Sequence, residues 1–353
     1  MPETSRTLIV TGASSGIGRA LALAGARAGF RAVITARRRA ELEEVAGSIR
    51  SDGGACVTLD GDITAPDMPA RIVSAAAQAF ARIDVIVNNA GLAAYGALLD
   101  QSDAALAEQW QLHVLAPLRL ARSAIAQLEA TRGQLVFVGS GVARVPLPLY
   151  GGYSLAKAAI RAAAIQLRRE LRPRHIAVTY VDPGVVATEF HSRIGITRTT
   201  EFVASPERIA RAILRGIARR SAVVNGVPWQ TALTALGEWS GTLADPIVSK
   251  RFAPSKVEPA TPPVPYPPEL PFHPEPFDKL RTGCVEGGAN NTVSIERALE
   301  PVARRMSRVN LPVGFLRDTL VPGATLELNA LAMRWAGMPN KNERAALEEA
   351  LEA

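Results

Sequence analysis

The first 225 residues or so alternate short apolar runs, rich in Val, Ile and Leu, with longer stretches of helical periodicity. Short apolar runs of this kind are typical of strands that are buried on both faces of a sheet. The seven strand candidates are Thr7–Val10, Ala32–Thr35, Cys56–Leu59, Asp84–Val87, Gln134–Val138, Ala177–Val181 and Ala222–Val224. Strands that alternate with helices predict βαβ units, and therefore an α/β fold with a doubly wound parallel sheet and helices on both faces.

Two helical stretches follow the sheet region. Ser205 and Pro206 form an N-cap and first-turn pair that predicts the start of the first one. The second, around Trp229 to Leu243, carries an apolar stripe of Trp229, Leu233, Leu236 and Leu243. Such a stripe packs on its own domain, on an oligomer partner or on a membrane surface, and flanks poor in basic residues favour the first two. A homo-oligomer is therefore one open interpretation.

Proline divides the chain into three parts. Ten of the 23 residues from Pro254 to Pro276 are proline, which excludes a continuous helix and predicts an extended linker. We expect a catalytic domain over residues 1–253, a disordered proline-rich linker over 254–290, and a small helical tail over 291–353. Apolar residues recur at helical spacing in that tail, from Ile295 to Val309.

Composition excludes several classes of protein. No apolar run is long enough for a membrane span, and the first strand begins almost at once, without a secretory leader, so we expect a cytoplasmic protein. The two cysteines, Cys56 and Cys284, have no metal-ligand or disulfide spacing, which predicts free thiols and no metal site. The net charge of +7 comes from arginines scattered along helical segments, so nucleic acid is not an expected partner.

A glycine-rich turn, TGASSGIG, lies between the first strand and the first helix. In this context such a turn binds the pyrophosphate of a dinucleotide, as in Rossmann-type folds. Gly12 allows the tight turn, Gly16 a close approach of the backbone to phosphate, and Gly18 close packing of helix on strand. Ser14, Ser15 and Ile17 complete the turn, so all of these residues are candidate cofactor contacts.

The end of the second strand indicates which dinucleotide. NAD-binding proteins usually place an acidic residue there for the ribose 2′-hydroxyl, but this chain has Ala36. Arg37 and Arg38 follow, and their guanidinium groups suit a 2′-phosphate. We therefore expect NADP(H). Arg39, and as an open alternative Arg38 too, is expected to be a solvated residue at the start of the next helix.

Tyr153 and Lys157 are four residues apart in a helical segment, so they share one helix face. A neighbouring ammonium favours the phenolate, which predicts that Lys157 lowers the pKa of Tyr153 and makes it a general acid or base.

Several motifs then occur in a specific order: TGASSGIG, Asp62-Ile63, Asn88-Asn89-Ala90-Gly91, Ser140, YSLAK and Pro183-Gly184. In order and spacing they resemble the short-chain dehydrogenase/reductase family, in its shorter, non-extended branch, over roughly residues 5–253.

The resemblance implies a hydride transfer between a nicotinamide and a substrate carbon. Tyr153 would be the general acid or base, Ser140 would stabilise the substrate oxygen, and Lys157 would also hold the nicotinamide ribose. The remaining cofactor contacts that it implies are Asp62 and Ile63 at the adenine, Asn89, Ala90 and Gly91 in the cleft, and Val186 and Thr188 at the carboxamide, after Pro183 and Gly184.

One position departs from the family. His113 stands where the family has an asparagine that supports a water in a proton relay behind the lysine. Either His113 takes over that role, in which case it titrates near neutrality and enters the rate, or it is a passive helix residue.

The substrate is expected to be an apolar or aromatic carbonyl compound or alcohol. The predicted walls are Leu92–Leu99, Val142–Tyr150 and Val185–Phe202, with Tyr95, Val142, Leu147, Leu149, Tyr150, Phe190 and Phe202 facing it. The alternative to an enzyme is a cofactor-binding regulatory protein with little turnover.

Overall fold

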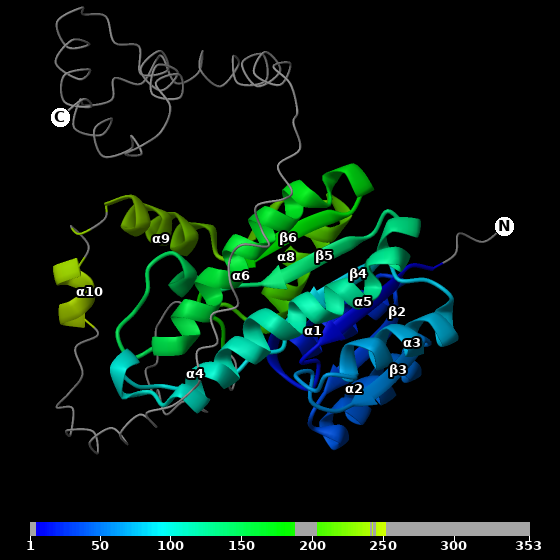
Figure 1. The fold of residues 1–353 in the computed structure, drawn as a ribbon. Coiled ribbons are helices and arrows are strands. Elements are labelled where there is room, and N and C mark those ends of the chain that lie inside the picture. The colour runs from blue at the N-terminus through cyan, green and yellow to red at the C-terminus, as the bar shows by residue number, and fades with distance from the viewer. Residues whose placement is uncertain (1–4, 188–202, 241, 243–244, 252–353) are drawn as a thin grey trace, which may run out of the picture. The chain divides into compact units, whose positions relative to one another are not determined.

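The computed structural model describes residues 5–187, 203–240, 242 and 245–251, and these contain one seven-stranded parallel sheet (Figure 1). Its strand order is β3-β2-β1-β4-β5-β6-β7. The strands are β1 Thr7–Thr11, β2 Arg31–Ala36, β3 Cys56–Asp60, β4 Val85–Asn88, β5 Gln134–Val138, β6 Ala177–Asp182 and β7 Val223–Asn225. All seven predicted strands, and the doubly wound parallel sheet, are confirmed.

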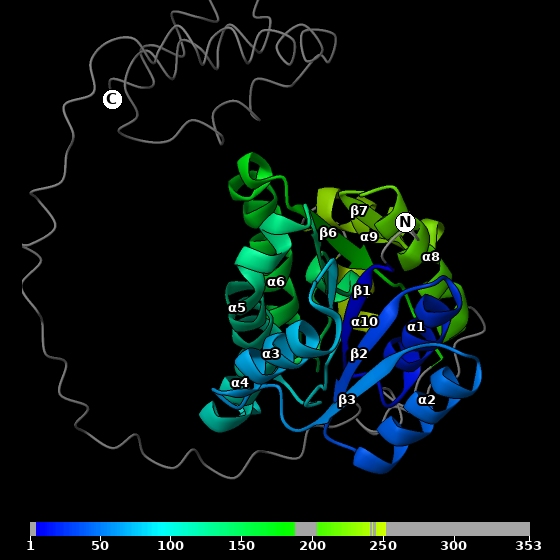
Figure 2. The ribbon, with the colours of Figure 1, turned by 90° about the vertical axis from the view of Figure 1, so that its right-hand side faces the viewer.

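Helices cover both faces of the sheet (Figure 2). The α-helices are α1 Gly16–Arg27, α2 Arg39–Ser51, α3 Met68–Phe80, α4 Asp103–Trp110, α5 Ala116–Ala130, α6 Gly151–Glu170, α8 Pro206–Ala218, α9 Pro228–Ser240 and α10 Asp245–Arg251. Helices α1, α2 and α8 share an apolar cluster with one face of the sheet, and α3, α5 and α6 share a second cluster with the other. Successive residues of β1 alternate between the two, since Leu8 and Val10 belong to the first cluster and Ile9 to the second.

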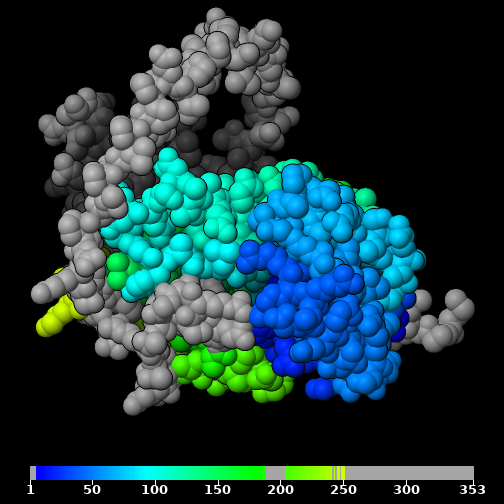
Figure 3. Space-filling model, turned by 90° about the horizontal axis from the view of Figure 1, so that it is seen from below, coloured from blue at the N-terminus to red at the C-terminus, as the bar shows by residue number. Residues whose placement is uncertain are grey.

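The order in which successive strands are added to the sheet reverses at β1. Strand β1 pairs with β2 on one side and with β4 on the other. The loops after β1 and β4 therefore diverge at the carboxyl edge, which is where open α/β sheets bind their ligands. In the space-filling view from below (Figure 3), cyan residues near position 100 adjoin blue residues from the first part of the chain.

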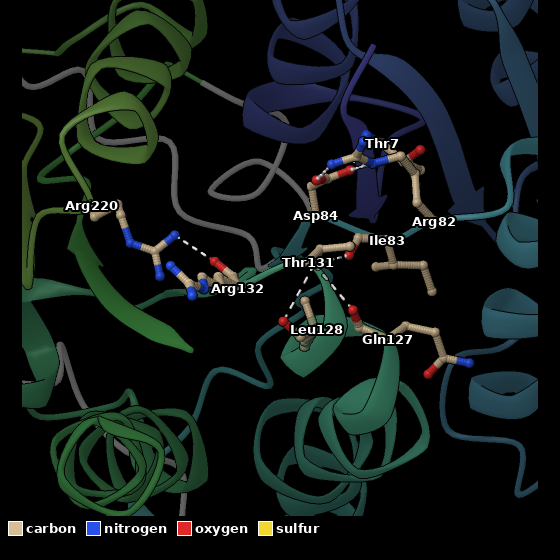
Figure 4. A network of polar contacts seen from close by, with 9 residues as sticks. All are labelled: Thr7, Arg82, Ile83, Asp84, Gln127, Leu128, Thr131, Arg132 and Arg220. Carbon is tan, nitrogen blue, oxygen red and sulfur yellow. Dashed lines mark hydrogen bonds and ion pairs between the residues drawn. The ribbon is translucent and has the colours of Figure 1, made fainter. Parts of the chain in front are cut away.

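A polar network closes the opposite, amino-terminal edge of the sheet (Figure 4). The buried Asp84 carboxylate accepts hydrogen bonds from the Thr7 backbone N–H (2.8 Å) and from the Arg82 guanidinium (2.9 Å from Nε). Thr131 Oγ1 donates to the Ile83 carbonyl (2.7 Å), and Arg220 donates to the Arg132 carbonyl (2.6 Å). These contacts satisfy backbone groups of the segments that enter β1, β4 and β5.

The apolar stripe predicted near residue 230 lies on α9. Trp229, Leu233 and Leu236 are 53%, 61% and 57% exposed, so the described part of the chain leaves much of this stripe uncovered, and its packing on its own domain or on an oligomer partner stays a prediction. Leu243 lies outside the described residues, as do the predicted linker and tail. Among the helices that the structure describes, none has the length and apolar character that crossing a membrane requires.

Candidate active site

The glycine-rich turn joins β1 to α1 at the carboxyl edge. Gly12 has φ +67°, and a Cβ there would lie 2.8 Å from Ala90 Cα. A Cβ on Gly18 would lie 2.2 Å from the Gly12 carbonyl oxygen. Neither position has room for a side chain, so the turn holds the start of α1 close to the end of β1.

The first turn of α1 has neither a side-chain cap nor an acidic residue. Ser15 is its N-cap and makes no side-chain cap hydrogen bond. The backbone N–H groups of that turn are therefore free of a competing carboxylate and suit a phosphate.

The Asn88–Gly91 segment braces this turn from β4. Asn89 Nδ2 donates to the carbonyls of Thr11 (3.0 Å) and Gly12 (3.3 Å). Thr11 Oγ1 accepts from the backbone N–H groups of Asn89 and Ala90, both at 3.0 Å. Asn89 thus shapes the turn with its own side chain. This role of the Thr11 hydroxyl was not predicted, because a threonine at the end of a strand has no distinguishing sequence pattern.

Arg38 connects the end of β2 to the glycine-rich turn. Its Nη2 donates to Ser14 Oγ (3.2 Å), and its Nη1 pairs with Glu41 (3.1 Å). Arg37 is exposed, and Arg39 begins α2 as an exposed residue, as predicted.

The Asp62–Ile63 pair follows β3. Asp62 is exposed and Ile63 is buried. Burial raises the pKa of Asp62, but hydrogen bonds from Thr64 and the charge of Arg37 outweigh it and hold that pKa below its usual value. Arg37 and Asp62 therefore lie near one another at the end of the sheet where the adenine is expected.

Ser140, Tyr153 and Lys157 come together at the carboxyl end of β5. Ser140 follows β5 and is the N-cap of the 3₁₀ turn η3, Gly141–Ala143. Tyr153 and Lys157 lie in the first two turns of α6, and both are buried. The hydroxyls of Ser140 and Tyr153 share a hydrogen bond. Lys157 Nζ lies 5.5 Å from the centroid of the Tyr153 ring and donates to the Val138 carbonyl (2.8 Å).

Burial controls the protonation of this group. Desolvation raises the pKa of Tyr153 well above its usual value, although the hydrogen bond with Ser140 lowers it. Desolvation also lowers the pKa of Lys157 to about 8. The net shift of the Tyr153 pKa is therefore upward, opposite to the lowering predicted from Lys157, because burial outweighs every contact that favours the phenolate.

His113 lies in a π-helical turn, η2 Gln111–Leu115, between α4 and α5. It is buried, its Nε2 donates to the Leu92 carbonyl (2.6 Å), and its ring packs edge-on against Tyr153, 5.2 Å between centroids. Burial and the charge of Lys157 lower the His113 pKa to about 3. Of the two alternatives for His113, titration near pH 7 is therefore wrong, since the imidazole is uncharged at that pH.

The loop after β6 lies beside this centre. Gly184 has φ +69°, and the Val185 backbone N–H donates to Gln230 Oε1 of α9 (2.7 Å). Val186 is buried in an apolar cluster and pairs with Ala204. Thr188, Phe190 and Phe202 lie outside the described residues.

Two aromatic rings extend the site from Tyr153. Tyr150 lies 6.3 Å from Tyr153 and meets Tyr95 edge-on at 5.8 Å, all between centroids. Gln101 holds the Tyr95 loop to α6, because it donates to the Ala94 carbonyl (3.1 Å) and accepts from the Gly152 backbone N–H (2.9 Å). Gln101 was not foreseen, because nothing in its sequence neighbourhood marks a residue that joins two distant loops.

Tyr180 of β6 is a second residue that the sequence analysis missed. Its hydroxyl accepts from the backbone N–H of Ser140 and donates to the Ser140 carbonyl, both at 3.3 Å. A Cβ on Gly139 would lie 2.1 Å from that hydroxyl, so the Tyr180 ring requires the glycine that precedes Ser140.

Comparisons with known proteins agree with this geometry. A family model described as short chain dehydrogenase matches residues 6–198. A short chain dehydrogenase of Pseudocercospora fijiensis is 36% identical over 188 residues, which are 52% of this chain and 60% of the relative.

Solved structures show the same fold. A short-chain dehydrogenase from Sphingobium yanoikuyae in complex with NADPH has a TM-score of 0.59 and 29% identity, over 72% of this chain and all of the other. A Burkholderia phymatum homologue in complex with NAD has a TM-score of 0.63 and 20% identity, over 69% of this chain and 96% of the other. The family match covers more than half of the sequence, and the chain belongs to the short-chain dehydrogenase/reductase family.

Proposed function

We propose that this chain is an NADP(H)-dependent oxidoreductase that interconverts a carbonyl compound and an alcohol. The observation that carries the proposal is the hydrogen bond between the Ser140 and Tyr153 hydroxyls, beside the buried Lys157 and at the same sheet edge as the glycine-rich turn. A proton donor, a hydroxyl partner and a cation then surround one point at which a substrate oxygen can bind.

The residues of the turn fit a dinucleotide. The start of α1 would hold the pyrophosphate, with Arg37 and Arg38 at the 2′-phosphate and Asp62 and Ile63 at the adenine. Asn89, Ala90 and Gly91 would line the cleft, Lys157 the ribose, and the segment Pro183, Gly184, Val186 and Thr188 the carboxamide. When bound, the dinucleotide supplies or accepts the hydride.

Tyr153 and Ser140 act on the substrate oxygen. Because burial keeps the Tyr153 phenol protonated at neutral pH, it can donate its proton to that oxygen during reduction. The Ser140 hydroxyl donates a hydrogen bond to the same oxygen as negative charge develops on it. The Lys157 ammonium stabilises the phenolate that remains, which solvent then protonates. Oxidation of an alcohol reverses each step.

The substrate that suits this site is apolar or aromatic. Tyr95 and Tyr150 present their rings beside Tyr153, and Val142 is buried in the turn after Ser140. Aromatic rings prefer such edge-on contacts with other rings.

Consumption of NADPH over a panel of aryl and alicyclic aldehydes and ketones tests this function. We expect turnover with wild type, and in Tyr153→Phe a loss of most turnover with NADPH affinity retained, because only the proton donor is removed. Wild type that binds NADPH tightly without turnover would instead support the regulatory alternative. Unchanged turnover in Tyr153→Phe would contradict the mechanism.

Cofactor preference has its own test. Arg38 reaches the glycine-rich turn through Ser14, no acidic residue ends β2, and the similar Sphingobium yanoikuyae protein was solved with NADPH. Arg38→Asp should raise the KM for NADPH by about ten- to a hundredfold and leave the KM for NADH nearly unchanged, since a charge-assisted contact becomes a repulsive one.

The design of that variant keeps α2 intact. Arg38 is the N-cap of α2, a position at which aspartate is favoured, so the substitution should fold. Arg39→Asp, at the exposed first residue of the helix, is the matched control. A wild type that prefers NADH would contradict the assignment.

A further inference from the structure

Glu238 of α9 binds two arginines that belong to the catalytic elements. Its Oε2 accepts from Arg144 Nη1 at 2.7 Å, and its Oε1 accepts from Arg161 Nη1 at 2.8 Å. Arg161 makes a second contact, from Nη2 to Oε2, at 3.3 Å. Arg144 and Arg161 precede Glu238 by 94 and 77 positions in the chain, and they meet at its carboxylate.

The two arginines have different relations to the active site. Arg144 is the C-cap of η3, whose N-cap is Ser140. Arg161 lies one helical turn after Lys157 and two after Tyr153, so the three share a face of α6. Glu238 therefore ties the turn that presents Ser140 to the helix that presents Tyr153 and Lys157.

The packing of α9 supports the same connection. A Cβ on Gly141 would lie 3.2 Å from Thr234 Cγ2, and a Cβ on Gly237 would lie 2.9 Å from Val145 Cγ2. The helix thus sits directly against the turn after Ser140, without room for larger side chains.

The ion pairs are partly shielded from water. The side chains of Arg144 and Arg161 are 18% and 24% exposed, and that of Glu238 is 38% exposed. Burial raises the pKa of Glu238, but the hydrogen bonds from Arg144 and Arg161 outweigh it and the net shift is downward, so the carboxylate is charged at neutral pH. Because Arg161 contacts both oxygens of Glu238, this pair fixes the relative orientation of the two side chains as well as their distance.

We propose that Glu238 is a positioning residue, which sets the distance between the Ser140 hydroxyl and Tyr153 by holding η3 and α6 together. It touches neither hydroxyl, and it acts on the reaction only through Ser140. The inference rests on the proposed function, since it assigns Ser140 a part in turnover.

The test is a double-mutant cycle in the full-length chain, with NADPH and the carbonyl compound of the panel that wild type reduces fastest. Glu238→Gln keeps the shape of the side chain and removes its charge. We expect its kcat to fall by about ten- to a hundredfold, because small displacements of reacting groups have effects of this size, with NADPH affinity unchanged. Glu238→Asp, which keeps the charge, should recover part of the loss.

The decisive measurement is Glu238→Gln in a Ser140→Ala background. If Glu238 acts through Ser140, Glu238→Gln should lower kcat by less than about twofold in the Ser140→Ala background, because the hydroxyl that Glu238 positions is absent. Glu108→Gln, an exposed glutamate on α4, is the control and should match wild type in both backgrounds.

Two outcomes would overturn the proposal. One is an equal loss of kcat with and without Ser140, which means that Glu238 acts independently of Ser140. The other is an unchanged kcat, with or without a lower melting temperature, which indicates a purely structural ion pair. If Ser140→Ala and Tyr153→Phe themselves retain wild-type turnover, the proposed function fails instead. Absence of turnover with every carbonyl compound would overturn both.

Discussion

Burial determines how the groups around Tyr153 ionise. The phenol, the Lys157 amine and the His113 imidazole all lie in one buried group, and in each of them burial favours the uncharged form. Residue spacing predicted the Tyr153–Lys157 pair, and the family resemblance predicted Ser140. They could not give the protonation states, because these depend on solvent exclusion by residues from β5, η2 and α6 that are distant in sequence.

His113 should act as a neutral hydrogen-bond donor. His113→Leu leaves the Leu92 carbonyl without its hydrogen-bond donor, which should lower the free energy of unfolding by about 1–3 kcal/mol. It should also lower turnover, because the Tyr153 ring loses the imidazole that packs against it. His113→Gln, whose amide reaches a similar place, should recover most of both. Because the His113 pKa is about 3, wild type and His113→Gln should have the same pH–rate profile between pH 5 and 8. A limb near pH 6.5 that is present only in wild type would contradict this assignment.

Lys157 should make stability depend on pH. Its pKa is lowered from 10.5 in the unfolded chain to about 8 in the folded one, so the unfolded state binds more protons between these values. The free energy of unfolding should therefore gain a contribution as pH rises from about 8 towards 10. In Lys157→Met this contribution should be absent. Denaturant unfolding of both proteins at pH 7.5, 8.5 and 9.5 measures it, and parallel pH dependences would contradict a depressed lysine pKa.

Helices and strands that follow a local sequence pattern could be predicted, whereas features that depend on contacts between distant elements could not. Most residues of the inner strands β1, β2, β4, β5 and β6 are apolar because both faces of that part of the sheet are buried, so these strands could be predicted. The edge strands β3 and β7 are only partly buried. The Thr11–Asn89 brace could not be predicted, since it joins β1 to the segment after β4, and the π-helical turn at His113 was not predicted either. The exposed stripe of α9 illustrates the same limit, because an amphipathic pattern indicates a face and does not identify what covers it.

The amino-terminal edge should contribute to stability alone. Asp84→Asn leaves either the Thr7 N–H or the Arg82 guanidinium with an imperfect acceptor in a buried place, which should lower the free energy of unfolding by about 1–3 kcal/mol. Turnover per folded molecule should stay the same, because the active site lies at the other edge of the sheet. Asp52→Asn is the control, since its ion pair with Arg27 is exposed and such pairs contribute at most about 1 kcal/mol. A loss of kcat in Asp84→Asn at temperatures where it is folded would contradict this separation.

At the scale of the whole molecule, the two apolar clusters on either side of the sheet are built from residues between Leu8 and Val227. Every predicted catalytic or cofactor-binding residue precedes residue 189, and α9 and α10 continue the described chain to Arg251. The predicted catalytic domain of residues 1–253, the linker and the tail all stay predictions.

A chain that ends after Pro254 should consequently fold and turn over. It keeps both apolar clusters and the α9 contacts of Gln230 and Glu238, so its melting temperature should lie within about 2 °C of the full chain, a shift that corresponds to no more than about 1 kcal/mol in a domain of this size. Its kcat/KM for NADPH and the best carbonyl compound should be unchanged. A chain that ends after Val227 is the contrast: it retains both clusters but lacks α9, and should lose most turnover because η3 and the Val185 loop are no longer held. An insoluble or inactive product from the first chain would show that residues beyond Pro254 complete the core or the substrate site.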